Sequence, residues 1–356
     1  MELIVIIPSN RSVRLDYLEP LIEKGARFIV VDDTEGSVKV PHPAFQVFDW
    51  GDRRRRLGEL DEWFPRRNGS CRSYGFYLAW CEANHDDIIV ALDDDCELDE
   101  RDFVAQLERT LGAASRPVAE VSGLHLNILD LYENIPDGLF PRGFPYSERG
   151  GYRGCVLNRT EEAAPLFNLG LWRGAFDVNA IDKIMGPEWI HPQGRLRQAS
   201  TLVAPGHLIS ACSMNMHFRA QVIPATYQLP MHVPVMDNWV IDRYGDIWGG
   251  FILKVLMDRR GDWMSVGAPM INHTKAAGFE RNAWQEHICH MVNDEFIEVL
   301  LAAAEEVPST DYLEMMVALR EGFARRSEGS SSLLRGYLEH LVRALEAWTT
   351  ALARGR

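Results

Sequence analysis

The sequence lacks both of the glycine-rich motifs through which many proteins hold nucleotide phosphates. It has no G-x-G, so the dinucleotide fingerprint of flavin and nicotinamide enzymes is absent, and it has no Gly-Lys pair, which a P-loop requires. We therefore expect neither flavin nor NAD as a cofactor. Any phosphate that the protein binds has to be held by a metal ion and by side chains instead.

Paired cysteines and long apolar runs at the start of the chain are also missing. The six cysteines are scattered, with no C-x-x-C: Cys71, Cys81, Cys96, Cys155, Cys212 and Cys289. This spacing fits neither a disulfide framework nor a zinc ribbon, and reduced thiols are its simplest explanation. The run from Leu3 to Ile7 is too short to span a membrane, and no basic segment or cleavage site accompanies it. We expect a cytoplasmic protein with no membrane partner.

Positive charge is in the minority. The 37 lysines and arginines face 51 aspartates and glutamates, so the formal net charge is -14. This balance argues against nucleic acid or an anionic membrane surface as the main partner. A phosphorylated small ligand is compatible with it, because such a site needs only local positive charge. The 356 residues are enough for one large α/β domain with an appendage.

The first part of the chain alternates between predicted strands and helices. Strands predicted at 3–7 and 28–31 each end in polar residues, and a helix is predicted between them at 17–24. This order favours a parallel sheet with a nucleotide crevice at the carboxyl ends of its strands. A further helix predicted at 71–83 has Arg72 near its start, so this side chain would point toward the same crevice.

Three consecutive carboxylates follow the apolar run at 88–92: Asp93, Asp94 and Asp95. The run predicts a buried strand, and acids at its end repel one another unless a cation compensates them. Hard oxygen ligands suit Mg²⁺ or Mn²⁺ carrying a diphosphate. The alternative is an acidic turn that leads into the helix predicted at 99–111.

The remainder of the chain is less regular until its last third. We predict strands at 118–126 and 211–218, a strand or loop at 270–275, and a structured segment at 176–184 in which Asp177 is placed to cap a helix. The segment 131–154 is rich in Gly, Pro, Tyr and Arg, which indicates a lid or substrate loop.

Three long helices are predicted near the end of the chain, at 280–307, 310–325 and 332–354. We expect an α/β catalytic domain at 1–300 and a C-terminal helical extension at 301–356. The extension serves either as an oligomerisation surface or as a cover for the core. A homo-oligomer is the expected state.

Several blocks, taken in order, resemble the reversibly glycosylated polypeptides, a family that includes the plant UDP-arabinopyranose mutases. The resemblance runs from about Leu3 to about Glu298. The most telling block is the arginine loop from Arg142 to Arg149, which reads RGFPYSER. The other blocks are Cys71-Arg72 with Tyr74-Gly75, Asp93 to Cys96, Gly170 to Trp172, Met214-Asn215, Arg243-Tyr244 with Asp246 and Trp248, and His273 to Lys275. Gly245 stands where the family has an acid.

The resemblance implies an A-type glycosyltransferase fold, which is a Rossmann-like α/β fold with a mixed central sheet. It also implies the following site residues. Nucleotide contacts would come from Pro8, Ser9, Asn10, Arg11, Asp32, Asp33, Arg72, Asp93 and Asp94. A Mn²⁺ or Mg²⁺ ion would be held by Asp93, Asp95 and His273, and the sugar would be contacted by Trp172, Asn215 and Trp248. Arg142, Arg149 and Asp246 would be the catalytic residues.

Each of these assignments has a simpler alternative. His273 would be a hydrogen-bonded structural residue, and the tryptophans would fill the core. Both arginines would pair with loop carboxylates, and Asp246 would cap a helix. A guanidinium stays protonated, so we expect Arg142 or Arg149 to clamp phosphate, and covalent attack on the sugar by Arg142 is the secondary alternative.

The function implied is a flavin-independent, metal-dependent mutase. It would interconvert the pyranose and furanose forms of a UDP- or GDP-linked sugar. The alternative is a glycosyltransferase that moves the sugar to itself or to an external acceptor, and a non-catalytic binding subunit comes third. Mutase and transferase differ in whether an acceptor site exists beside the sugar.

Overall fold

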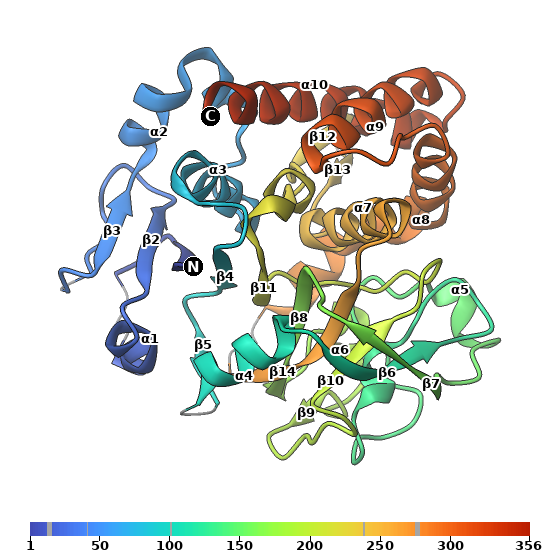
Figure 1. Cartoon of the computed structure of the whole chain (residues 1–356). Coiled ribbons are helices and arrows are strands. Elements are labelled where there is room, and N and C mark those ends of the chain that lie inside the picture. Colours follow the sequence, from blue (N-terminus) through green and yellow to red (C-terminus); the bar gives the residue numbers. More distant parts are fainter. Residues whose placement is uncertain (13–15, 41, 100–101, 238, 275–277) are drawn as a thin grey trace.

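In the computed structural model, which describes residues 1–12, 16–40, 42–99, 102–237, 239–274 and 278–356, twelve strands of the described chain form one mixed sheet (Figure 1). Its order is β3 (Phe45–Phe48), β2 (Arg27–Asp32), β1 (Leu3–Ser9), β4 (Ile88–Leu92), β11 (Asn215–Arg219), β8 (Phe167–Ala175), β14 (Met264–His273), β10 (Ser200–Val203), β6 (Ala114–Glu120) and β7 (Val156–Ala163). Two short strands join beside this path: β5 (Cys96–Leu98) pairs with β14, and β9 (Ile190–His191) pairs with β8. A separate hairpin consists of β12 (Val233–Met236) and β13 (Trp239–Ile241).

The first four strands of this order are parallel, and β11 begins the mixed half. β1 pairs in parallel with both β2 and β4, so the carboxyl ends of these three strands meet at one edge. β11 then pairs antiparallel with β4 and with β8. The predicted α/β class with a mixed central sheet is confirmed.

Helices cover the sheet, and the last of them lies beside elements from the first half of the chain. They are α1 (Glu19–Glu23), α2 (Trp50–Leu57), α3 (Arg72–Glu82), α4 (Phe103–Leu111), α5 (Tyr146–Arg149), α6 (Ala180–Met185), α7 (Gly245–Arg260), α8 (Phe279–Ala304), α9 (Tyr312–Ser327) and α10 (Ser332–Arg354). In Figure 1, α10 runs from α9 back to α2 and α3, where the chain ends. None of the helices within the described ranges is both long enough and apolar enough to cross a bilayer.

The C-terminal helices are tied to the core by buried indole groups. Nε1 of Trp80 in α3 donates to the Leu352 carbonyl at 2.9 Å, and Nε1 of Trp348 in α10 donates to the Pro224 carbonyl at 2.9 Å. Trp348 is fully buried. These helices therefore cover the core in this structure, while the domain boundary at residue 300 stays a prediction.

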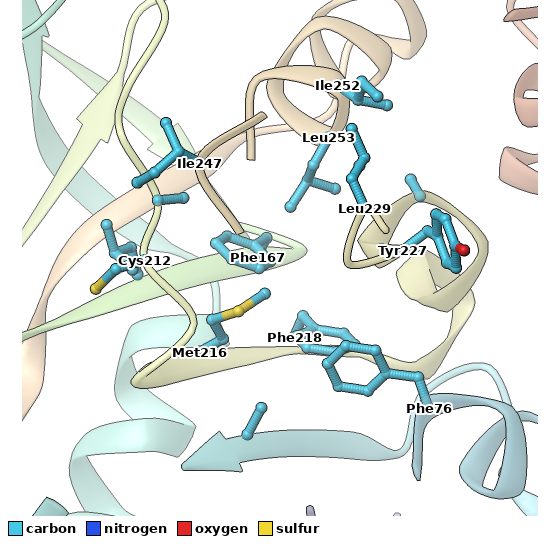
Figure 2. Packing of buried hydrophobic residues seen from close by; sticks show 14 of the residues in the cluster. Phe76, Phe167, Cys212, Met216, Phe218, Tyr227, Leu229, Ile247, Ile252 and Leu253 are labelled. Atoms are coloured by element: carbon cyan, nitrogen blue, oxygen red, sulfur yellow. The ribbon is translucent and has the colours of Figure 1, made fainter. Parts of the chain in front are cut away.

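Aromatic packing joins the parallel half of the sheet to its mixed half. Figure 2 shows Phe76 of α3 beside Phe218 of β11, and their ring centroids are 5.6 Å apart. On its other side Phe218 stacks with Phe167 of β8 at 5.7 Å. All three side chains are fully buried. Burial of such large rings supplies much of the hydrophobic stabilisation of the sheet.

Gly75 allows α3 to lie directly on β1 and β2. A Cβ added at this glycine would be 2.5 Å from Cγ2 of Ile6 and 3.0 Å from Cγ2 of Val31. We expect Gly75→Ala to lower the free energy of unfolding by about 1–3 kcal/mol, because this overlap outweighs the better helix propensity of alanine. Urea unfolding measures the change.

Gly150 provides the matched control for this substitution. It has a φ of -65° and an added Cβ would meet no atom within 4 Å. Gly150→Ala should therefore change the free energy of unfolding by less than about 0.5 kcal/mol. Equal urea midpoints for the two variants would show that α3 does not need this close approach.

Two predictions about the middle of the chain are wrong. The strand predicted at 118–126 is β6, which ends at Glu120, and Asp177 caps no helix, because α6 begins after Asn179. No strand is predicted at 167–175, yet β8 occupies the middle of the sheet. Gly170 weakens the sequence signal for this strand. A Cβ at this position would lie only 2.1 Å from Nδ2 of Asn215 in the neighbouring strand. The last residue of the strand predicted at 270–275 lies outside the described residues.

Candidate active site

Two adjoining cavities lie at the edge where β1 and β4 end. The acidic cavity, of about 200 Å³, is lined by Pro8, Ser9, Asn10, Asp33, Arg67, Asn68, Gly69, Cys71, Asp93, Asp94 and Asp95. The arginine cavity, of about 330 Å³, is lined by Arg67, Asn68, Gly69, Ser70, Arg72, Asp93, Arg142, Ser213, Gln228, Met231, Asp242, Arg243, Gly245, Asp246 and Gln285. They share Asp93 and the turn at 67–69, so a single ligand can extend from one to the other.

The parallel pairing of β1 with β4 brings the predicted nucleotide contacts together. The loop after β1 meets the acids after β4: Ser9 Oγ donates to Asp94 at 2.6 Å, and Arg11 forms an ion pair with the same carboxylate. Nη2 of Arg11 is also 3.6 Å from a carboxylate oxygen of Asp95. All three acids line the acidic cavity, and Asp94 is in addition held by the β1 loop.

Asp32 and Asp33 have different roles, although they are neighbours in sequence. Asp32 is buried and accepts hydrogen bonds from the Val38 backbone and from Thr34, so it orders the loop after β2 instead of lining either cavity. Asp33 lines the acidic cavity and accepts from Nε1 of Trp50 at 2.9 Å. Burial raises the pKa of Asp33 above its ordinary value.

The acids after β4 fit a divalent cation. Among the described residues, ligand atoms of Asp93, Asp95 and Cys96 lie within 4.8 Å of one another. Burial raises the pKa of Asp93, and the nearby Asp95 adds to this, although Arg72 opposes both. A cation between the two carboxylates would relieve this repulsion with the hard oxygen ligands that Mg²⁺ and Mn²⁺ prefer. Burial also raises the pKa of the Cys96 thiol well above its ordinary value, so Cys96 stays protonated and is a poor ligand.

His273 lies on the strand next to these acids but outside that group of ligand atoms. β14 pairs with β5 so that His273 is opposite Cys96. Its Nδ1 donates to the Ala175 carbonyl at 2.7 Å, which matches the structural alternative. Its role as a third metal ligand stays a prediction.

Arg142 lies in the arginine cavity between two carboxylates. Its Nε is 3.0 Å from both oxygens of Asp177, and its Nη2 donates to Asp246 at 2.6 Å. Burial alone would lower the pKa of Arg142, but the two carboxylates outweigh this effect and raise it well above the ordinary value. The guanidinium therefore remains a cation, as expected. Its pairing with Asp177 and Asp246 is the arrangement that the structural alternative predicts for this arginine.

Asp246, the second residue of α7, connects Arg142 to the rest of the cavity. It accepts from the Ser213 backbone at 3.4 Å as well as from Arg142. The carbonyl of Ser213 in turn accepts from Nη1 of Arg72 at 2.6 Å, and Arg72 pairs with Asp93. One network thus links Arg142 to the predicted metal-binding turn. A Cβ at the preceding Gly245 would be 2.5 Å from the Leu229 carbonyl, so this backbone has no room for the acid found there in the family.

Arg149 lies outside both cavities and apart from Arg142, so its role as a phosphate clamp stays a prediction. It pairs with Asp182 of α6 at 2.8 Å, and its guanidinium lies 4.0 Å from the ring centre of Tyr146. The chain turns at Gly143, where φ is +90°, and then enters α5. This turn sends the two arginines to different surroundings.

The three predicted sugar contacts are also placed differently from expected. Trp172, Asn215 and Trp248 are fully buried, and none of them lines either cavity. Trp248 stacks on Phe296 at 4.3 Å and donates to Asn293, while Asn215 donates to the Pro269 carbonyl. Both tryptophans fill the core because their elements are covered by other parts of the chain.

Several residues that line or support the cavities were not predicted from the sequence: Arg67, Asp177, Ser213, Gln228 and Arg243. Two of them carry a local signal: Arg67 directly precedes the turn at Asn68-Gly69, and Arg243 lies in a block that resembles the family. The others come from segments that approach the cavity only after folding.

The family model and the named relatives that match this chain indicate the same family. A family model described as "Reversibly glycosylated polypeptide" matches residues 2–352. "UDP-arabinopyranose mutase 3" of Arabidopsis thaliana is 27% identical, with 98% of this chain and 91% of the relative covered. "Probable UDP-arabinopyranose mutase 1" of Pisum sativum is 26% identical, with 98% and 90% covered.

Solved structures also resemble this chain, and one of them is named here. Glucosyl-3-phosphoglycerate synthase from Mycobacterium tuberculosis, crystallised with Mn²⁺, UDP and phosphoglyceric acid, is 13% identical and has a TM-score of 0.37. The match covers 83% of this chain and 78% of that one. The family assignment rests on the family model, which matches almost the whole chain. The protein therefore belongs to the reversibly glycosylated polypeptide family.

Proposed function

We propose that the protein is a divalent-metal-dependent mutase that interconverts the pyranose and furanose forms of a UDP-linked sugar. The observation that carries this proposal is the junction of the two cavities at Asp93, which would put the diphosphate on the acidic turn and the sugar beside Arg142 and Asp246. The names of the relatives favour UDP over GDP and arabinose as the sugar. The reaction would need no flavin.

Asp93 and Asp95 would hold Mn²⁺ or Mg²⁺, and Pro8, Ser9 and Asn10 would contact the nucleoside. When bound, the ion would neutralise the diphosphate and make it a better leaving group. Arg72 is buried and paired with Asp93, so it adds a fixed positive charge on the sugar side of that carboxylate. Arg67, at the junction of the cavities, adds another.

The mutase reaction breaks the bond between the anomeric carbon and the diphosphate, and the electron pair goes to the phosphate oxygen. A different sugar hydroxyl then attacks the anomeric carbon, the bond between that carbon and the original ring oxygen breaks, and the diphosphate returns to the anomeric carbon. The closing hydroxyl loses one proton and the former ring oxygen gains one. Asp246 borders the cavity and is the carboxylate that we propose holds this proton. Arg142 would keep Asp246 oriented and stabilise its charge.

The test is incubation with UDP-arabinopyranose and related UDP- and GDP-sugars in Mn²⁺, followed by chromatography and mass measurement. A mutase produces an isomeric nucleotide sugar of unchanged mass, and chelation of the metal should stop its formation. Free UDP with a heavier protein or a heavier acceptor would instead identify a transferase and overturn the proposal.

A further inference from the structure

A third cavity, of about 340 Å³, adjoins the arginine cavity. It is lined by His232, Trp239, Val240, Asp242, Arg281, Trp284, Gln285 and His287, which come from the β12–β13 hairpin and its flanks and from the start of α8. Asp242 and Gln285 line both cavities. Nε2 of Gln285 donates to Asp242 at 2.9 Å, so this hydrogen-bonded pair forms a polar wall between them.

The other walls of this third cavity carry exposed aromatic rings. Trp284 is 72% exposed and Trp239 is 40% exposed, whereas Trp172 and Trp248 are fully buried in the core. The ring centre of His287 is 4.8 Å from that of Trp284 and 5.8 Å from that of Trp239. The three rings thus form a continuous aromatic surface. Leaving two indoles in water costs hydrophobic stabilisation, so a ligand that covers them would recover it.

We propose that this third cavity binds a neutral saccharide beside the nucleotide-linked sugar. The identity of that neighbouring sugar site rests on the proposed function. A sugar ring has a face of C–H groups, which packs on an indole, and a rim of hydroxyls, which bond to carboxylate and amide groups. The cavity offers both in one place: the rings of Trp284 and Trp239, and the polar wall of Asp242 and Gln285.

The position of the cavity favours a saccharide over a second copy of this chain. Met291 follows Trp284 by seven residues on α8 and is 59% exposed, so an interface between copies would cover Met291 together with Trp284. A saccharide would use only the hollow next to the polar wall, which is shared with the arginine cavity. The mutase reaction uses no acceptor, so a saccharide bound here would take no part in the isomerisation.

The test is calorimetric titration of the full chain with trisaccharides of arabinose, xylose and glucose, without any nucleotide sugar. We expect saturable binding of at least one of them, weakened about tenfold or more by Trp284→Ala, because central aromatic contacts dominate such sites. Met291→Ala removes an exposed apolar side chain from the same helix outside the cavity and should bind like the wild type. Trp284 is largely exposed, so its replacement should leave the fold intact.

Absence of binding to every trisaccharide, or equal binding by wild type and Trp284→Ala, would overturn the proposal. So would light scattering that shows a smaller assembly for both variants while saccharide binding is unchanged, because that result identifies the face as an interface between copies. Turnover of UDP-sugars is measured separately. A chain that binds the trisaccharide but makes no isomeric nucleotide sugar would refute the mutase and leave the saccharide site standing.

Discussion

Asp95→Ala is expected to abolish sugar isomerisation, with a loss of about 1000-fold or more. The reason is that Asp95 and Asp93 are the carboxylates proposed to hold the divalent ion, and stabilisation of a departing diphosphate by such an ion is worth several kcal/mol, each 1.4 kcal/mol being about tenfold in rate. The fold should survive, because removing one of three adjacent acids relieves repulsion. The rate of isomer formation and the calorimetric affinity for Mn²⁺ measure the effect.

Glu97→Gln is the matched control for Asp95→Ala. Glu97 is two residues further along the chain, lies on β5 and is exposed, and it lines neither the acidic nor the arginine cavity. Its neutralisation should leave both the rate and the Mn²⁺ affinity near the wild-type values. If Asp95→Ala turned over normally in the presence of metal, the assignment of the ion to this turn would be wrong.

Arg142→Ala is expected to have the largest effect on stability. It leaves Asp177 and Asp246 without their shared cation in a place where Arg142 itself is only 7% exposed. Breaking a buried ion pair from one side costs about 3–5 kcal/mol, and turnover should fall as well because Asp246 loses its orientation. Urea unfolding gives the stability change, and turnover is compared under conditions in which the variant is still folded.

Two further variants test this explanation: one separates charge from geometry within the network, and the other removes an arginine outside it. Arg142→Lys keeps the positive charge but cannot reproduce the forked contacts to both carboxylates, so it should recover only part of the lost stability. Arg149→Ala removes a partly exposed pair with Asp182 and should cost about 1 kcal/mol. If Arg142→Ala and Arg149→Ala were equally stable, the buried network would not support the cavity as described.

The parts of the site that follow local patterns were predictable. An apolar run that ends in carboxylates specifies a strand and its polar end without reference to the rest of the chain, which is why the turn at 93–95 and the loop at 8–10 were placed correctly beside one cavity. Arg72 was predicted for the same reason, since it begins the helix that precedes that strand. The central strand β8 was not predicted, because its glycines weaken the local strand pattern. These glycines leave room for residues of the neighbouring strands, which the local sequence does not show.

The sequence by itself determined the parallel strands, the acids at their ends and the family of the chain. Only the tertiary structure decided which charges face one another. Asp177 is 35 residues from Arg142 and Asp246 is 104 residues from it, yet both contact the same guanidinium. The same reason explains the tryptophans: residue type indicates that an indole prefers burial, but the packing of other elements decides whether Trp248 fills the core and Trp284 faces a cavity. Such contacts depend on long-range packing, for which no local run of residues carries a signal.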